Sequence, residues 1–144
     1  MATESPGYHH VAIAATNFEA SKAFYDKVMG HLGLAPAIQA TGYPHKDAEG
    51  RLCIYASKTM MFSLWEAEKA ARGNKFQVYN VGLHHIAFAA PTRESVDELH
   101  KKLAADGVTI LDPPKEYQYV PGFYAVYFKD PDGMKLEYAF TPRG

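Results

Sequence analysis

The sequence predicts an α+β protein built from two copies of one β-α-β-β-β module, and two observations carry this prediction. First, the chain repeats itself once: after a shift of 75 residues, His9–Ala15 lies on His84–Ala90 with five of seven residues identical. Second, both copies continue with the same order of hydrophobic periods, which is one strand, one helix and three short strands. Because each helix must cover one face of its sheet, we expect two curved sheets that form a shared cup with the helices outside.

Length and composition indicate one globular domain. The chain has 144 residues, of which 47% are apolar and 22% are charged, as in ordinary globular proteins. A formal net charge of -1 provides no basic field for a phosphate backbone, so nucleic acid is excluded as a partner. No apolar run approaches the roughly 18 residues of a membrane span, which excludes a membrane partner. A single cysteine, Cys53, fits a reducing compartment, and we expect a cytoplasmic protein.

The first module covers about residues 8–66. Its opening strand, His9–Ala15, leads into a helix for which Thr16 and Glu19 have the spacing of a capping box. Apolar residues that recur every four positions predict the buried face of this helix, namely Ala20, Phe24 and Val28. Alternating patterns predict three further strands, at about Ala37–Ala40, Leu52–Ala56 and Met60–Trp65.

A polar linker, residues 67–81, separates the first module from the second, which covers about residues 82–140. In the second helix Thr92 is the expected N-cap and Gly107 the expected end. The apolar stripe of this helix consists of Val96, Leu99 and Leu103. The remaining strands are expected at Val108–Leu111, Phe123–Phe128 and Met134–Phe140, with a long Tyr- and Pro-rich loop at Pro113–Pro121.

The strand period of two places one histidine of each copy on the face opposite the helix. His10 shares this face with Ala12 and Ala14, and His85 shares it with Ala87 and Ala89. Methyl-sized neighbours leave room that a close-packed core would fill with larger side chains. His9 and His84 have the other parity and are the fallback ligands.

The last strand of the second copy carries a carboxylate on the same kind of face. Glu137 alternates with the bulky residues Leu136 and Tyr138, and it should therefore project into the same cavity as the two histidines. Two imidazoles and one carboxylate that converge from different strands match a facial arrangement that binds a divalent metal and leaves positions open. The residues thus predict a metal site at His10, His85 and Glu137.

These features resemble the vicinal oxygen chelate superfamily, which includes glyoxalase I, extradiol dioxygenases and bleomycin-resistance proteins. The matching segments are His10–Ile13, Gly82–Phe88 and Phe128–Glu137, and the resemblance extends from about Tyr8 to Phe140. It implies one glyoxalase-like domain in which a metal is held by His10, His85 and Glu137 and chelates a substrate through two adjacent oxygens. It also implies a homodimer, with the two modules pairing within one chain or between chains.

The fourth ligand of this family has no obvious counterpart in the chain. Counting from the matching turn residue places Ser63, a poor metal ligand, at the position equivalent to Glu137. Glu66 is the nearest carboxylate, but its parity puts it on the helix side unless a bulge shifts the strand. Either Glu66 ligates through a bulge, or the site has three protein ligands, or the cup has lost its metal.

Three functions remain open. The first is a glyoxalase-like lyase or isomerase, in which a divalent metal (Zn, Ni, Co or Mn) polarises a carbonyl and Glu137 or Glu66 acts as the catalytic base. The second is an Fe(II) dioxygenase of the extradiol type, with Tyr119, Tyr124 or Tyr138 available as a proton relay. The third is a non-catalytic protein that binds a flat aromatic molecule. The expected substrate pocket is lined by Trp65, Ser63, Tyr55, Phe123 and Tyr124.

Overall fold

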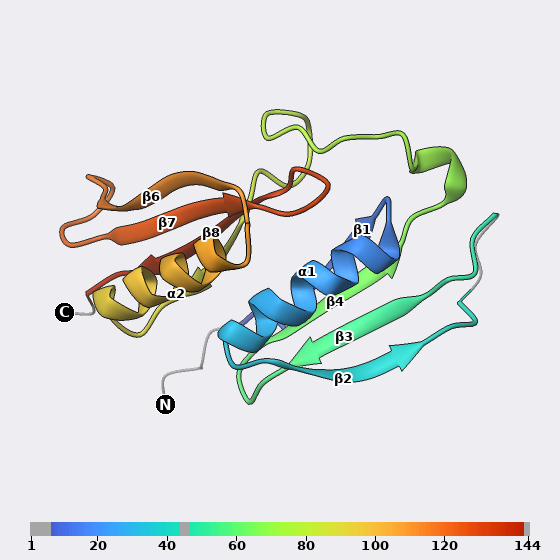
Figure 1. Ribbon diagram of the computed structural model, residues 1–144, viewed down its shortest axis with the longest axis horizontal. Coiled ribbons are helices and arrows are strands. Elements are labelled where there is room, and N and C mark those ends of the chain that lie inside the picture. The colour runs from blue at the N-terminus through green and yellow to red at the C-terminus, as the bar shows by residue number, and fades with distance from the viewer. Residues whose placement is uncertain (1–6, 44–46, 143–144) are drawn as a thin grey trace, which may run out of the picture. The chain divides into compact units, whose positions relative to one another are not determined.

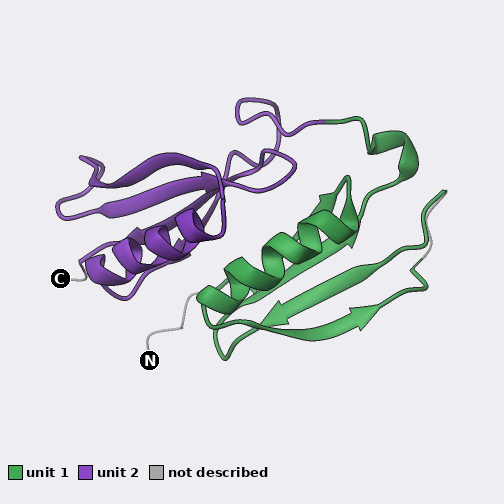
Figure 2. Cartoon of the chain, viewed as in Figure 1, with its two compact units in different colours: residues 1–74 green, residues 75–144 purple. Residues whose placement is uncertain are grey.

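The structure, a computed structural model, describes residues 7–43 and 47–142, and it confirms the α+β class and the repeated β-α-β-β-β order (Figure 1). The chain divides into two units, residues 1–74 and 75–144, which are described separately below (Figure 2). None of the helices within the described ranges is long and apolar enough to cross a membrane.

Unit 1 is one four-stranded sheet covered on one face by a helix (Figure 1). Its elements are β1 (Val11–Ala15), α1 (Phe18–His31), β2 (Ala35–Ala40), β3 (Leu52–Ala56) and β4 (Met61–Glu66). The strand order is β1-β4-β3-β2, with β1 parallel to β4 and the other pairs antiparallel. The core of the unit lies between α1 and the sheet, where Tyr25 and Phe62 stack with ring centroids 4.9 Å apart.

The N-terminus and the buried face of α1 differ from the prediction. Asn17 is the N-cap, because its side-chain oxygen accepts a hydrogen bond from the amide of Ala20 at 3.1 Å. Ala20 is exposed and Phe24 is only half-buried, so the predicted stripe was wrong at both positions and right at Val28. The face that packs on the sheet is formed by Phe18, Ser21, Tyr25, Val28 and Met29.

Unit 2 repeats this architecture. Its elements are β5 (Ile86–Ala89), α2 (Arg93–Ala105), β6 (Ile110–Glu116), β7 (Tyr124–Lys129) and β8 (Lys135–Phe140), in the sheet order β5-β8-β7-β6. The cap prediction is confirmed, because the hydroxyl of Thr92 accepts from the amide of Ser95 at 3.1 Å. The stripe prediction is confirmed too, since Val96, Leu99 and Leu103 are buried. Gly107, with φ of 73°, follows the C-cap Asp106 and ends the helix as predicted.

The strand β6 is longer than predicted and shortens the expected loop. It runs from Ile110 to Glu116, so the first part of the predicted loop Pro113–Pro121 is strand. Prolines cannot donate a ladder hydrogen bond, but β6 lies at the edge of its sheet, where this loss is tolerated. Register shifts on both sides of Asp112 accommodate them.

The segment between the modules is docked at both ends. A 3-10 turn, η1 (Lys69–Ala71), is held by Asp47, whose carboxylate accepts from the amides of Lys69 at 2.7 Å and Ala70 at 3.1 Å. Further along, the amide of Phe76 donates to the carbonyl of Asp132 in unit 2 at 3.2 Å. The division between the units, after Asn74, falls between these two attachments.

Candidate functional site

Each unit carries two adjacent histidines just before its first strand, and both pairs have the same geometry. The Nδ1 atoms of His9 and His10 lie 2.8 Å apart, and those of His84 and His85 lie 2.7 Å apart. A hydrogen bond at Nδ1 fixes the orientation of an imidazole ring and leaves Nε2 available. His9 and His84, the fallback ligands, are thus placed to orient His10 and His85.

In unit 2 the structure brings His85 and Glu137 together. Nε2 of His85 lies 2.9 Å from Oε2 of Glu137, whose side chain is only 3% exposed. The register of β8 with β5 pairs Glu137 with Ala87, which places the carboxylate on the face predicted from parity. The other carboxylate oxygen, Oε1, is buried and has no hydrogen-bond partner among the described residues.

This arrangement fits a cation. An ionised carboxylate that is buried with one oxygen unpaired is unfavourable, and most buried polar atoms do have partners. A carboxylate oxygen and an imidazole nitrogen that face each other are donor types that divalent transition metals use. Within either unit, no three His, Cys, Asp or Glu side chains of the described residues gather around one centre. His85 and Glu137 could therefore hold two coordination positions of a divalent cation, and a complete site would need at least one further ligand.

Two tyrosines next to Glu137 were not predicted from the sequence. Tyr127 is paired with Glu137 in the β7–β8 register, and burial together with this carboxylate raises the pKa of the Tyr127 phenol. The ring of Tyr117 packs edge to face against Tyr127 with centroids 5.3 Å apart. Burial above all raises the pKa of Tyr117 to about 12, and its hydroxyl has no hydrogen-bond partner among the described residues. Parity across the predicted hairpin could have identified Tyr127, because residues of one face pair with residues of the same face.

In unit 1 the register supports the position assigned to Ser63. Ala12 pairs with Ser63 just as Ala87, its repeat counterpart, pairs with Glu137. Ser63 is 5% exposed, and its hydroxyl accepts a hydrogen bond from the indole nitrogen of Trp65 at 3.1 Å. Ser63 and Trp65 thus lie on the face of the sheet opposite α1. This is the face of Ala12 and Ala14, whose parity His10 shares.

Glu66 lies elsewhere, so the prediction that it is a metal ligand or catalytic base requires correction. The β4 register is unbroken against both β1 and β3, and the bulge that Glu66 would need is absent from these strands. Glu66 pairs with Ala15, at the far end of β1 from His10. Five residues of strand correspond to roughly 16 Å, and the odd spacing puts the two side chains on opposite faces.

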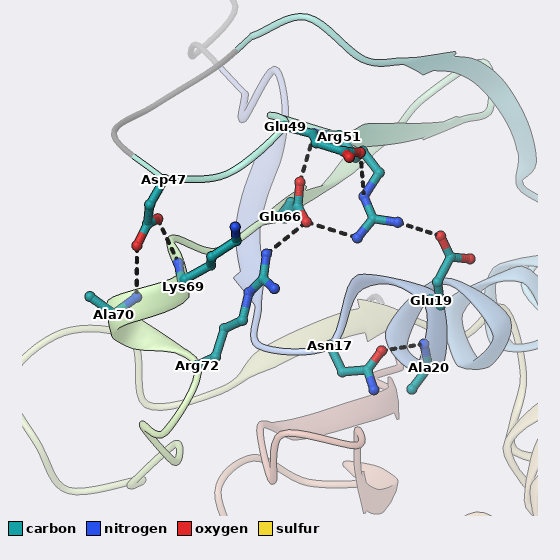
Figure 3. A network of polar contacts seen from close by, with 10 residues as sticks. All are labelled: Asn17, Glu19, Ala20, Asp47, Glu49, Arg51, Glu66, Lys69, Ala70 and Arg72. Carbon is teal, nitrogen blue, oxygen red and sulfur yellow. Dashed lines mark hydrogen bonds and ion pairs between the residues drawn. The ribbon is translucent and has the colours of Figure 1, made fainter.

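Glu66 is instead the centre of a polar network (Figure 3). Its carboxylate accepts from the guanidinium groups of Arg51 and Arg72, each at 2.8 Å, and Arg51 also pairs with Glu19 of α1. The hydrogen bond from Arg51 is the main reason that the pKa of Glu66 falls from 4.5 to about 2. A cavity of about 350 Å³ opens beside the network and is also lined by Asp47, Ala48 and Lys69.

Two of the predicted pocket residues face a helix rather than an open surface. Tyr55 is fully buried and donates its hydroxyl hydrogen to Asp26 of α1 at 2.8 Å. Tyr124 donates to Asp97 of α2, also at 2.8 Å, so it belongs to the helix side of β7. The prediction that both line the pocket is therefore wrong, because the strand period of two puts Tyr55 and Tyr124 on the helix side of their sheets. Phe123, in contrast, contacts the ring of Tyr117 with centroids 6.3 Å apart.

Comparison with known proteins identifies relatives over almost the whole chain. The family model of the Glyoxalase/Bleomycin resistance protein/Dioxygenase superfamily matches residues 7–138. An uncharacterized protein of Bacillus subtilis, YqjT, is 28% identical, and the match covers 90% of this chain and 94% of YqjT. The metallothiol transferase FosB of Bacillus licheniformis is 27% identical, with 91% of this chain and 73% of FosB covered.

Solved structures have the same fold. A glyoxylase/bleomycin resistance protein/dioxygenase domain from Frankia sp. EAN1pec superposes with a TM-score of 0.79 at 19% identity, covering 98% of this chain and 96% of that domain. The fosfomycin resistance protein FosX from Listeria monocytogenes, solved with Mn(II) and sulfate, gives a TM-score of 0.65 at 17% identity. That match covers 94% of this chain and 93% of FosX. At these identities the two structures support the fold alone.

Proposed function

The chain belongs to the Glyoxalase/Bleomycin resistance protein/Dioxygenase superfamily, and from that premise we propose that it is a metal-dependent enzyme acting on a small metabolite that chelates the metal through two oxygens. The proposed ligands are His85 and Glu137, which lie in unit 2, and His10, which lies in unit 1. Ser63, at the position equivalent to Glu137, leaves the site with three protein ligands.

The buried carboxylate of Glu137 is the observation that carries this proposal. One of its oxygens faces Nε2 of His85, and the other has no partner among the described residues. A bound divalent cation would relieve this unfavourable burial. The name of the relative FosB, a metallothiol transferase, supports a metal at this site.

The surroundings of Glu66 argue against this residue as the base of a proton transfer. When bound, the metal would supply a Lewis acid that polarises a substrate oxygen. An isomerase also needs a protein base of raised pKa, but the pKa of Glu66 is lowered to about 2 and Glu66 is held by two arginines. Tyr127 and Tyr117 border Glu137 and would exclude water from that side of a bound substrate.

A second candidate is an Fe(II) dioxygenase of the extradiol type. It is favoured by the three-ligand set that follows from the Ala12–Ser63 register, because open positions on iron would accept a diol and O₂. The two candidates differ in the metal that they require.

Elemental analysis of the purified protein tests the proposal. We expect about one transition-metal ion per chain in the wild type, and a large loss of that metal in His10→Ala and in Glu137→Gln. His100→Ala and Glu98→Gln, which change the same residue types on α2, are the matched controls and should keep it. Stoichiometric iron would select the dioxygenase. A wild-type protein that takes up no transition metal even after reconstitution would contradict both candidates and leave the non-catalytic binding protein.

A further inference from the structure

Three rows of side chains cross the face of the unit 2 sheet that is opposite α2. The register pairs Lys129 with Lys135, then Tyr127 with Glu137, and then Ala125 with Ala139. On the other side of β8, Ala87 extends the row of Glu137 and Ala89 extends the row of Ala139. Along the strands, the first row of this face therefore carries two cations, the second row carries the carboxylate, and the third row carries only alanine methyl groups.

The two lysines are placed unusually for a sheet. Like charges directly opposite each other on neighbouring antiparallel strands destabilise the pair. Neither ammonium group forms an ion pair with a carboxylate of the described residues. Both side chains are half-buried rather than fully exposed. The contact of Lys135 with the ring of Tyr127 offsets only part of this concentration of positive charge.

Lys135 is also directed toward the candidate site. Its ammonium nitrogen lies 4.3 Å from the centroid of the Tyr127 ring. Tyr127 belongs to the row of Glu137, so the side chain of Lys135 reaches from its own row toward the row of Glu137. The ring of Tyr127 in turn lies 6.2 Å from that of His85, centroid to centroid. An ammonium group held over this ring keeps N–H groups available for a ligand, because a ring face cannot satisfy all three.

We propose that the substrate carries a carboxylate, and that Lys135 binds this carboxylate with support from Lys129. The proposal rests on the proposed function, which makes this face the substrate face. The oxygens of the substrate that chelate the metal would lie beside Glu137 and His85, which would hold that metal, and its apolar part would lie over the alanine row. Lys135 is thus a specificity-determining residue that selects acids over neutral molecules of the same shape.

Binding of benzoate and benzamide, two probes of the same shape that differ in charge, tests this proposal. Titrations followed by NMR are carried out on the full chain, both after EDTA treatment and after loading with Mn(II). In the EDTA-treated wild type we expect benzoate to bind about tenfold more tightly than benzamide, which is the effect of one hydrogen-bonded charge. In Lys135→Met this preference should fall to near unity, and in Lys129→Met it should fall by a smaller factor.

Lys101→Met, on the exposed surface of α2, is the matched control and should keep the full preference. Equal affinity for the two probes, an unchanged preference in Lys135→Met, or no benzoate binding would each overturn the proposal. A preference that appears only in the Mn(II)-loaded protein would also overturn it, because the metal would then hold the anion. Measurement of metal content distinguishes a failure of this proposal from a failure of the proposed function. Under the proposed function, Lys135→Met should bind as much metal as the wild type, whereas Glu137→Gln should bind less.

Discussion

Glu66 and Glu137 are both buried carboxylates, yet their surroundings suit them to opposite roles. Glu66 accepts hydrogen bonds from two guanidinium groups and, at 3.3 Å, from the amide of Arg51. Its charge is therefore fully compensated within unit 1. Glu137 faces one imidazole and keeps one oxygen without a partner among the described residues. A compensated carboxylate stabilises the fold, whereas an uncompensated one is available to a ligand.

Replacement of Glu66 by glutamine should lower stability in a pH-dependent way. Because the pKa of Glu66 is lowered from 4.5 to about 2 on folding, its contribution is fully present above about pH 5. That contribution is lost as the pH falls toward 2. We expect Glu66→Gln to reduce the free energy of unfolding at pH 7 by about 1–2 kcal/mol, a modest figure because both arginines are partly exposed.

Urea denaturation of both proteins between pH 7 and pH 3 measures this difference. The wild type should lose its advantage over Glu66→Gln as the pH is lowered. Glu94→Gln, on the exposed surface of α2, serves as the control and should show little difference at any pH. A difference that stayed constant over the whole range would mean that the charge of Glu66 is not what stabilises the fold.

At this scale the sequence predicted what strand parity can predict. Parity correctly placed Glu137 opposite Leu136, and it already cast doubt on Glu66 as a ligand. It could not show that Arg51 and Arg72, which are 15 and 6 residues from Glu66 in sequence, would converge on that carboxylate. Such pairings depend on how separate elements pack, and a linear pattern does not contain them.

The two helices differ in how well their caps and buried faces were predicted from the sequence. The capping box predicted at Thr16 and Glu19 moves the start of α1 by one residue relative to the observed cap, Asn17. The stripe was predicted separately, from apolar residues that recur every four positions, and it picked Phe24 where the neighbouring Tyr25 is buried. In α2 the predicted cap, Thr92, is correct, and the predicted stripe is correct with it.

Replacement of the cap should therefore be costly in unit 1. We expect Asn17→Ala to lower the free energy of unfolding by about 1 kcal/mol, because the amide of Ala20 would lose its acceptor. Asn17→Asp, which keeps an acceptor and adds a favourable charge at the helix N-terminus, should retain the stability. Chemical denaturation of both variants provides the measurement. If Thr16→Ala proved more costly than Asn17→Ala, the cap predicted from sequence would be the correct one.

For the whole molecule, the repeat made the fold predictable. One alignment of the chain with itself fixed the number of modules, and the order of strands and helices followed from each copy. The extent of the linker was harder to predict, because polar composition does not distinguish a free segment from a docked one. Residues 69–71 form η1 on unit 1, and Phe76 is already bonded to unit 2. The chain therefore passes from one unit to the other within a few residues around Lys75.

Limited proteolysis with trypsin should detect this short crossing. The segment contains three candidate cleavage sites, after Lys69, Arg72 and Lys75. At the first site, the backbone amide of Lys69 is bound by Asp47, and at the second site the side chain of Arg72 is bound by Glu66. At the third site, the side chain of Lys75 is exposed and has no such contact with a described residue. Because proteases require local opening of the backbone, we expect cleavage after Lys75 to precede cleavage at the other two sites.

The same experiment tests whether the Glu66 network holds the start of the crossing. In Glu66→Gln, cleavage after Arg72 should increase several-fold relative to cleavage after Lys75, as measured by mass spectrometry of the fragments. Glu19→Gln removes a carboxylate that pairs with Arg51 but not with Arg72, so it should leave this ratio unchanged. The ratio is informative even if both variants are less stable, since global unfolding would expose the two sites equally. A ratio that did not respond to Glu66→Gln would show that Arg72 is held by something other than this carboxylate.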